Sequence, residues 1–305
     1  MNDATRPESR AGIAQSYAFT VAALLIRSTS FIGTKIAYAT FPPITLGALR
    51  FVIASAVLGI ALLVGKAHAK PTLQDLGIMA VSGVLGITLY FTLENIGVSL
   101  TTASNAALII ASYPAITTLL ELVIYRIKPS ASKVAGILIA MVGVYLLSST
   151  SGNEGNQSQH VGDLILVATG VVWALYSFTT RRVVARYPAV TVSFYQTIAG
   201  VICFIPLSLT EMARWQAPTV TSLAVLVYLG VMCSVAAFLL YNLGLRKLSP
   251  STSVSLMNLV PVFGVILAVL ILHETITARQ LIGGPIVMAG VLLSARKPSL
   301  PEAKK

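Results

Sequence analysis

The feature that most constrains this chain is a series of ten apolar runs separated by short polar or Pro/Gly-containing breaks. A helix of about 20 apolar residues spans the hydrocarbon core of a bilayer. Only 10% of the 305 residues are charged, whereas roughly a quarter are charged in soluble domains. The sequence therefore predicts an all-α membrane protein with ten transmembrane helices. Their expected ranges are 13–39, 43–65, 74–98, 101–126, 131–150, 161–184, 189–211, 219–245, 250–273 and 278–296.

The distribution of basic residues predicts the orientation. Of the 21 Lys and Arg residues, sixteen fall in segments that share one side if the N-terminus is cytoplasmic, and only Arg214 and Arg279 fall on the other. Lys and Arg concentrate in cytoplasmic loops. We therefore expect cytoplasmic tails at residues 1–12 and 297–305 and a multi-pass protein of the cytoplasmic (inner) membrane. The polar first ten residues and the long run after them do not match a cleavable signal peptide.

The net charge of +11 could indicate a nucleic-acid partner. However, the basic residues lie in short clusters between apolar runs and are not gathered on one soluble domain, as a nucleic-acid footprint requires. The sequence predicts no nucleic-acid binding. The expected partners are a small-molecule substrate and membrane lipid, and the protein is expected to be a monomer or a homodimer.

The two halves of the chain repeat each other. A first repeat at residues 13–150 and a second at 161–296 flank a polar linker at 151–160, expected to be extracytoplasmic. They align at an offset of 146 to 147 residues, which matches Arg27 with Trp173 and Gly83 with Gly230. Each repeat has five expected helices, and an odd number makes the second enter the membrane in the opposite direction. Inverted repeats of this kind are the architecture of many alternating-access transporters.

Several motifs resemble the bacterial ten-helix branch of the drug/metabolite transporter superfamily, which has two EamA domains. The resemblance covers nearly the whole chain, and its clearest segments are Phe31 to Lys35, Leu49-Arg50-Phe51, Trp173 to Tyr176, Tyr241 to Pro261, Glu274 and Gly283 to Gly290. It implies a central cavity lined mainly by helices 1, 3, 4, 6, 8 and 9, and export of amino acids or related metabolites as the commonest role. The chain departs from the family at Arg27, where Trp is usual, and at Arg126-Ile127-Lys128, where many first repeats carry Glu.

Arg27 is the most informative candidate site residue. It lies near the middle of the first expected helix, where a cation costs at least about 3 kcal/mol unless it faces water or a partner. Two interpretations stay open: Arg27 meets a substrate carboxylate or other anion, or it forms a structural ion pair, for example with Glu121. Trp173, its counterpart in the second repeat, would form an aromatic wall of the same cavity or simply pack the core.

Three further charged residues, Lys35, Arg50 and Glu94, fall in the outward halves of their helices. They are expected to form either a buried ionic network or a gate that opens and closes. Glu121 is a candidate for proton exchange, because desolvation raises the pKa of a carboxyl group toward neutral pH.

Two prolines interrupt helices near the expected mid-membrane level: Pro114 and its repeat counterpart Pro261. Proline removes a backbone hydrogen bond and kinks a helix, and the freed carbonyl can bind ligand only where it faces protein or a wet cavity. Either the kinks border the cavity, or they serve packing alone. The polar and aromatic groups proposed for substrate binding beside them are Tyr90, Ser112, Tyr113, Tyr176 and Asn258.

Enzyme signatures are missing from the sequence. It contains no GxxxxGK[ST], GxSxG or HExxH motif and no Cys/His cluster, so no catalytic residues, metal or cofactor are expected. The prediction is a secondary transporter that exports a small amphipathic metabolite such as an amino acid. It would be driven either by the substrate gradient or by proton exchange. The alternatives are multidrug efflux, a membrane-embedded enzyme acting on lipid-linked substrates, and a scaffold.

Overall fold

The computed structural model describes residues 10–65, 70–126, 130–148, 157–184, 186–237, 239–240 and 259–294, and every regular element within them is a helix. The first half contains α1 (Arg10–Ala37), α2 (Pro43–Val64), α3 (Leu73–Gly83), η1 (Val84–Leu89), α4 (Tyr90–Leu100), α5 (Ala103–Ile110), α6 (Tyr113–Tyr125) and α7 (Ala131–Ser148). The second half contains α8 (Gln157–Val184), α9 (Ala189–Ser208), η3 (Leu209–Arg214), α10 (Val220–Tyr228), η4 (Leu229–Ala236), α13 (Leu259–Leu272) and α14 (Ala278–Ser294).

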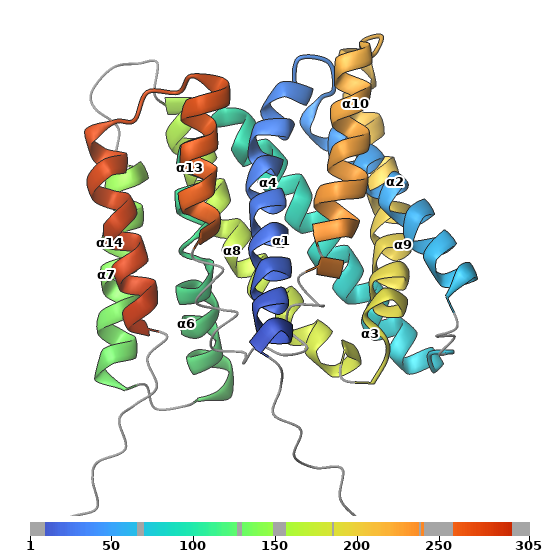
Figure 1. The fold of residues 1–305 in the computed structure, drawn as a ribbon, viewed down its shortest axis with the longest axis horizontal. Coiled ribbons are helices and arrows are strands. Elements are labelled where there is room, and N and C mark those ends of the chain that lie inside the picture. The colour runs from blue at the N-terminus through green and yellow to red at the C-terminus, as the bar shows by residue number, and fades with distance from the viewer. Residues whose placement is uncertain are drawn as a thin grey trace, which may run out of the picture.

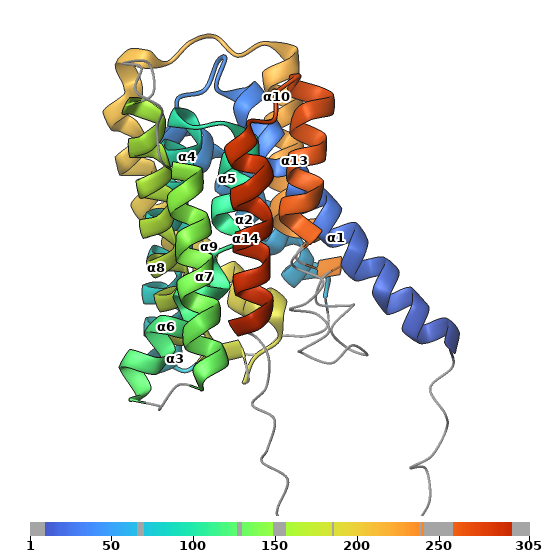
Figure 2. The ribbon, with the colours of Figure 1, turned by 90° about the vertical axis from the view of Figure 1, so that its left-hand side faces the viewer.

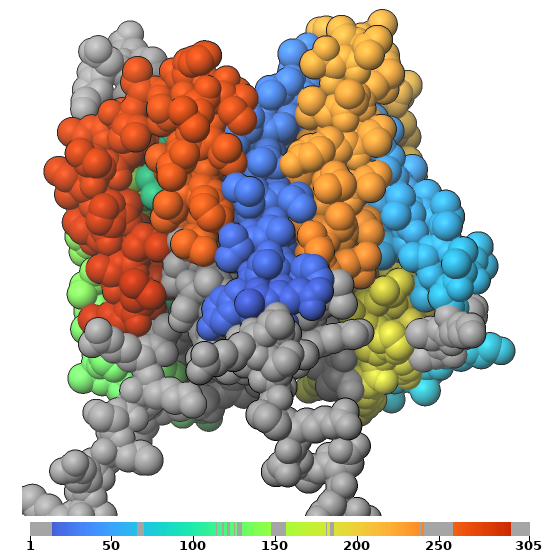
Figure 3. Space-filling view, viewed as in Figure 1, coloured from blue at the N-terminus to red at the C-terminus, as the bar shows by residue number. Residues whose placement is uncertain are grey.

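The helices form one bundle, and the long ones run from one end of it to the other (Figure 1). α1 begins and α14 stops at the end where α3 begins, which we call the α3 end. We call the opposite end, where α2 and α10 begin, the α2 end. The first turns of α1 lean away from the rest of the bundle (Figure 2). Farther along, α1 lies between α13 and α10, so a helix of the first half is flanked by helices of the second (Figure 3).

The helical spans agree with a membrane protein. Five are long and apolar enough to cross a bilayer: Ala14–Ala37, Pro43–Val64, Leu73–Leu100, Gln157–Thr180 and Ala189–Arg214. Four shorter apolar helices cover Ala131–Leu147, Val220–Ala236, Leu259–Leu272 and Ala278–Leu293. Each of these nine spans overlaps a different one of the ten expected ranges. Six lie inside their range, and Leu73–Leu100, Gln157–Thr180 and Ala189–Arg214 extend a few residues past it. The all-helical membrane class is thus supported, while the count of ten and the orientation of the termini stay predictions.

The fourth expected span does not form one continuous helix. Its two parts, α5 and α6, are separated by a turn at Ala111 and Ser112. Pro114 has no N–H to donate to the carbonyl of Ile110, which breaks the helical ladder at this point. The N–H of Ser112 donates instead to the Ile109 carbonyl at 2.9 Å. The sequence predicted a kink here, and the structure has a full break.

Local capping explains where several helices begin. Thr72, Thr102 and Thr219 precede α3, α5 and α10, and each side-chain oxygen accepts a hydrogen bond from the N–H three residues later. Thr is a favoured N-cap because it satisfies an N–H that has no partner within the helix. α2 instead begins with Pro43, a residue whose fixed φ suits the first helical position.

Large apolar side chains cover much of the outer surface. Leu63 of α2 is 81% exposed, Tyr145 of α7 is 72% exposed and Leu281 of α14 is 68% exposed. Soluble monomers rarely expose extended apolar surface. A bilayer solvates such side chains well, which accounts for their number on this bundle.

Helices of the two halves pack closely against each other. α3 packs on α9 and η4 packs on α2, and in both pairs a glycine lies at the contact. A Cβ on Gly83 would overlap the carbonyl oxygen of Gln196, and one on Gly230 would lie 2.8 Å from the Ile53 side chain. Any larger residue would push the helices apart. The two glycines matched by the sequence alignment therefore have equivalent surroundings, each against the second helix of the other half.

The most regular internal correspondence is a pair of π-helical segments. η1 and η4 begin at Val84 and Leu229, close to the repeat offset, and each continues an α-helix without interruption. π-helical turns are rare and often occur at functional sites. The sequence did not predict them. η1 ends directly before Tyr90, one of the predicted site residues.

Candidate functional site

An aromatic cluster lies inside the bundle where α4, α6 and α8 meet. The ring centroid of Tyr90 is 5.3 Å from that of Trp173 and 6.4 Å from that of Tyr113. Trp173 in turn lies 5.3 Å from Tyr176 on the same helix. Tyr90 and Tyr113 are buried, whereas Trp173 and Tyr176 are partly exposed. The structure thus brings four of the predicted substrate-binding residues together from separate segments of the chain.

Glu94 adds a carboxylate to this cluster. It lies one turn after Tyr90 on α4, and the Tyr90 hydroxyl donates to its Oε1 at 2.9 Å. No other described side chain hydrogen-bonds to Glu94 or pairs with it within 4.0 Å, and the residue is partly exposed although α4 runs through the bundle. Its strongest electrostatic neighbour is Arg50, and Arg27 is a weaker one.

Arg50 is held by polar and aromatic neighbours. Its Nε donates to the Ser234 hydroxyl at 2.6 Å and its Nη1 donates to the Ser30 hydroxyl at 3.0 Å. The guanidinium also lies 5.1 Å from the ring centroid of Phe91, within cation–π range. Only 5% of Arg50 is exposed. These contacts tie α2 to α1 and to η4 of the second half.

Arg27 has a different setting. It is partly exposed, and it makes no side-chain hydrogen bond or ion pair with any described residue. It does interact electrostatically with Glu94, Tyr90 and Tyr176. Arg27 is therefore a cation near the aromatic cluster that has no side-chain hydrogen bond or ion pair among the described residues.

The other predicted polar groups are engaged by the protein itself. The Ser112 hydroxyl donates to the Ile109 carbonyl at 2.7 Å, and the Tyr113 hydroxyl donates to the Leu166 carbonyl at 3.0 Å. Lys35 interacts electrostatically with Glu274. The expected direct ion pairs among Lys35, Arg50 and Glu94 do not form within the described residues, because serine hydroxyls and a tyrosine satisfy Arg50 and Glu94 instead.

Some predicted residues fall outside what the structure describes. Asn258 precedes the first described residue of α13. Pro114 and Glu121 lie in α6, but their side chains are not described, so the proposed Arg27–Glu121 pair stays untested. Pro261 lies in the first described turn of α13 and is buried, and the residue four positions before it is not described.

Two carboxylates at the α2 end, those of Glu274 and Glu211, were not among the predicted site residues. Glu274 accepts hydrogen bonds from the backbone N–H groups of Ala103 and Ser104 at 2.8 and 3.0 Å, at the N-terminus of α5. Glu211 accepts from the N–H and hydroxyl of Thr45 in the first turn of α2, at 2.8 and 2.9 Å. Helix N-termini favour a negative charge because their N–H groups lack helical partners.

Two more carboxylates connect the halves. Asp163 of α8, 1% exposed, accepts from the Asn105 amide at 2.7 Å and from the Thr101 hydroxyl at 2.6 Å. Asp75 at the α3 end accepts from the Tyr187 hydroxyl at 2.7 Å and pairs with Arg186 at 3.1 Å. Their only sequence signal was the presence of an acidic residue inside or beside an apolar run, which is costly in a membrane.

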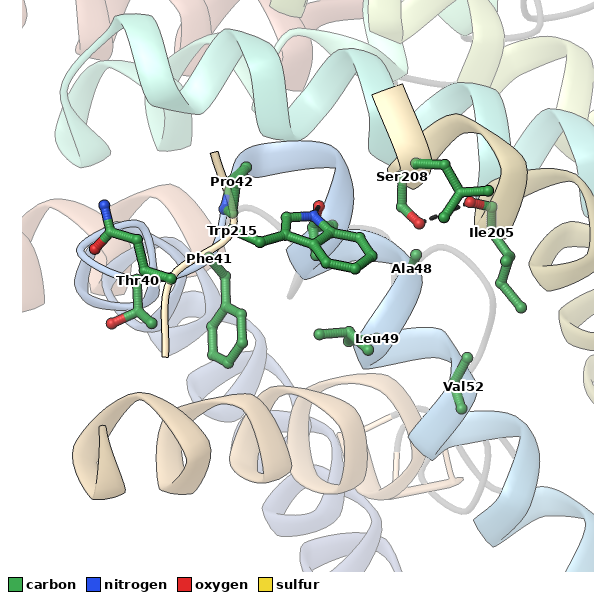
Figure 4. A pocket seen from close by; sticks show the side chains of 12 residues that line it. Thr40, Phe41, Pro42, Ala48, Leu49, Val52, Ile205, Ser208 and Trp215 are labelled. Atoms are coloured by element: carbon green, nitrogen blue, oxygen red, sulfur yellow. Dashed lines mark hydrogen bonds between the residues drawn. The ribbon is translucent and has the colours of Figure 1, made fainter. Parts of the chain in front are cut away.

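An apolar pocket lies away from the aromatic cluster, at the α2 end between α2, α9 and η3. Its volume is about 360 Å³, and Trp215 lies across the first turns of α2 (Figure 4). The remaining walls are mostly apolar, among them Phe41, Leu49 and Ile205. Leu49 and Ile205 also lie on the exposed apolar surface, at 36% and 43% exposure. The pocket offers no charged group, so it gives no basis for recognising a charged metabolite.

The candidate site therefore combines one partly exposed cation, one partly exposed carboxylate and an aromatic wall. Among the residues that the structure describes, no group of three or more His, Cys, Asp or Glu side chains is arranged to hold a metal ion. The arrangement is suited to holding a small molecule with a charged group and an apolar body.

Comparison with known proteins identifies the family. The profile of the EamA-like transporter family matches residues 15–149 and matches again at residues 160–296. This chain belongs to the EamA-like transporter family. The resemblance seen in the sequence is confirmed, and the chain is a membrane transporter of this family.

Proteins named as transporters or exporters in other organisms are similar to this chain over most of their length. An uncharacterized transporter of Archaeoglobus fulgidus is 31% identical over 279 residues, which cover 90% of this chain and 95% of the relative. A probable terminal-alkyne amino-acid exporter of Streptantibioticus cattleyicolor is 27% identical, over 87% of this chain and 86% of the relative. A crystal structure that is 22% identical superposes with a TM-score of 0.64 over 92% of this chain and 97% of that one, which supports the fold.

Proposed function

We propose that this EamA-like transporter is a secondary exporter of a small amphipathic metabolite, such as an amino acid or a derivative. It would work by alternating access between two inverted five-helix repeats in the cytoplasmic membrane. The observation that carries the proposal is the double match of one family profile to the two halves. The name of the Streptantibioticus relative, an amino-acid exporter, supports the substrate class and the direction.

Several contacts support the inverted relation of the repeats. The π-helical segments η1 and η4 lie at matching positions, and the two matching glycines pack against the second helix of the opposite half. If the second repeat is inverted, such exchanged contacts are the expected ones, since each half meets the other through the same surfaces. Alternating access then requires only that the halves exchange conformations around a shared site.

The location of Arg27 and the aromatic cluster supports their role as the shared site. Their residues come from α1, α4 and α6 of the first half and from α8 of the second. An aromatic wall next to an unpaired guanidinium would orient a substrate that has an apolar body and a carboxylate. Pro114, directly after the break between α5 and α6, would let the two parts of that helix move separately during the exchange.

Reconstitution in liposomes tests the function. Vesicles loaded with unlabelled amino acids, drugs or nucleotide sugars should accumulate the corresponding labelled compound when it is one of the protein's substrates. We expect saturable counterflow for an amino acid or derivative, lost in Arg27→Gln. A panel in which no compound exchanges faster than in protein-free vesicles would refute the transport function.

A second candidate is efflux of cationic drugs, which would use the Glu94 carboxylate oxygen that has no hydrogen bond to another described residue. In this case Arg27 would repel the substrate, so Arg27→Gln should increase drug exchange. The same vesicle panel separates the two candidates, because the variant has opposite effects in them.

The proposed orientation has a separate test. Reporter fusions placed after residue 160 should read extracytoplasmic, and fusions after Arg186 or at the C-terminus should read cytoplasmic, because the basic residues gather on that side. A cytoplasmic signal from the 151–160 linker would contradict both the inversion and the count of ten helices.

A further inference from the structure

Among the described residues around the aromatic cluster, positive and negative charges are unequal in number, and this excess charge constrains the substrate. The described charged residues around the aromatic cluster are Arg27, Arg50 and Glu94. Two guanidinium groups face one carboxylate, so this group of residues carries one excess positive charge. An uncompensated charge costs several kcal/mol in a low-dielectric interior, and a partner of opposite charge offsets that cost.

Arg50 and Glu94 form the balanced part of the site. Arg50 is the strongest electrostatic partner of Glu94, and both have fixed hydrogen bonds, Arg50 to Ser30 and Ser234 and Glu94 to Tyr90. Arg50 is also buried between α1, α2 and η4 and has little freedom to turn toward a ligand. The charges of Arg50 and Glu94 therefore offset each other without a substrate.

Arg27 is the remaining cation of this group, and no described carboxylate offsets its charge. It has no hydrogen-bond or ion-pair partner among the described residues, and it is partly exposed. The other four described acidic residues are engaged at the two ends of the bundle: Asp75, Asp163, Glu211 and Glu274. Glu121 lies eight residues beyond Tyr113 on α6, or about 12 Å along the helix axis.

The residues that interact with Arg27 indicate the rest of the ligand. Arg27 interacts with Tyr90 and Tyr176, and the ring of Trp173 lies 5.3 Å from each of these two rings. An anionic head on Arg27 would thus place its apolar body on this aromatic wall. A zwitterion would leave the excess charge in place, since its own ammonium cancels its carboxylate.

We propose that the Arg27 site selects substrates with one net negative charge and an apolar or aromatic body, and that it discriminates against zwitterions of the same size. Acidic or N-acylated amino acids and aryl carboxylates have this chemistry, whereas ordinary neutral amino acids do not. The proposal rests on the proposed transport function and narrows its substrate class. Binding alone can test it, independently of transport.

Three probes with the same phenethyl body isolate the charge: 3-phenylpropanoate is an anion, phenylalanine a zwitterion and phenethylamine a cation at pH 7. The chain has two tryptophans, so Trp215→Phe leaves Trp173 as the sole reporter of indole fluorescence. Titration of this variant in detergent micelles should show saturable quenching by the anion. We expect the anion to bind at least tenfold more tightly than the zwitterion and the cation to bind most weakly.

Matched variants assign the preference to Arg27. Arg27→Gln should reduce the tenfold preference to less than twofold, and Arg27→Lys should retain most of it. Lys35→Gln removes a charge from the same helix, two turns away, and should leave the preference unchanged. Glu121→Gln should also leave it unchanged, because the proposal assigns Glu121 no charge compensation at Arg27.

Three results would overturn the proposal. The first is a lack of saturable quenching by the anion, and the second is zwitterion binding as tight as anion binding. The third is a clear rise in anion affinity in Glu121→Gln, because Glu121 would then be the partner of Arg27. If the vesicle panel shows exchange, each of these three results refutes the charge selection at Arg27 but not the transport function. Conversely, anion binding without exchange of any compound would refute the transport function but not the anion site at Arg27.

Discussion

At the α2 end of the bundle, three carboxylates of the second half hold helices of the first, whereas at the α3 end one carboxylate of the first half is held by the second. Glu211, Asp163 and Glu274 form the α2-end set, and Asp75 forms the other, within the residues that the structure describes. Any separation of the halves at the α2 end must break all three. Among the described residues, the α2 end therefore has more carboxylate contacts between the halves than the α3 end.

The two ends also differ in the kind of bond. At the α2 end, Glu211 and Glu274 accept from backbone N–H groups at helix N-termini, and such charge-assisted bonds contribute roughly 1.5–3 kcal/mol. At the α3 end, the buried Asp75 carboxylate pairs with Arg186, whose side chain is 66% exposed. Water and salt around the exposed guanidinium screen this pair, so its expected contribution is smaller. Three predictions test this contrast.

The largest effect is expected from Asp163→Ala. The buried carboxylate accepts from Asn105 and Thr101, and its removal leaves two buried donors without an acceptor, at a cost of about 2–3 kcal/mol. Thermal unfolding in detergent should show a clearly lowered melting temperature. Asp163→Asn keeps one acceptor oxygen and is the matched control with a smaller loss. Equal melting temperatures for Asp163→Ala and wild type would show that this contact does not hold the α2 end.

An intermediate effect is expected from Glu211→Gln combined with Glu274→Gln. Neutral amides hold the helix N-termini more weakly, so the α2 end should open more often. Leu46→Cys, a site 1% exposed beside Thr45, reports this opening in a background with Cys203→Ser and Cys233→Ser. Loss of about 1.4 kcal/mol should increase the rate of labelling by a membrane-impermeant maleimide roughly tenfold. An unchanged rate would mean that the carboxylates stabilise single helices and do not close the α2 end.

The smallest effect is expected from Arg186→Gln at the α3 end. It removes an ion pair whose guanidinium is exposed but leaves the bond from the Tyr187 hydroxyl to the buried Asp75 in place. The melting temperature should stay within experimental error of wild type, while Asp75→Asn, which weakens both contacts, should lower it slightly. A loss in Arg186→Gln as large as that in Asp163→Ala would abolish the proposed difference between the ends.

Much of this fold was predictable from the sequence because its causes are local. An apolar run of about twenty residues is sufficient to predict a spanning helix, and nine of the expected ranges overlap the observed spans. The repeat was visible because matching residues recur at a constant offset, as Gly83 and Gly230 do, and the family profile also matches twice. Arg27 was conspicuous because a charge in an apolar run is costly whatever surrounds it.

What only the tertiary structure decided is which of these residues meet. Glu274 and Ser104 lie 170 positions apart, and Tyr90 meets Trp173 across two different repeats. No spacing rule connects such pairs, because their contact depends on how whole helices pack. Helix packing also decides how the two arginines differ, since both are cations in apolar runs. Ser30, Ser234 and Phe91 surround Arg50, whereas Arg27 has no hydrogen-bond or ion-pair partner among the described residues.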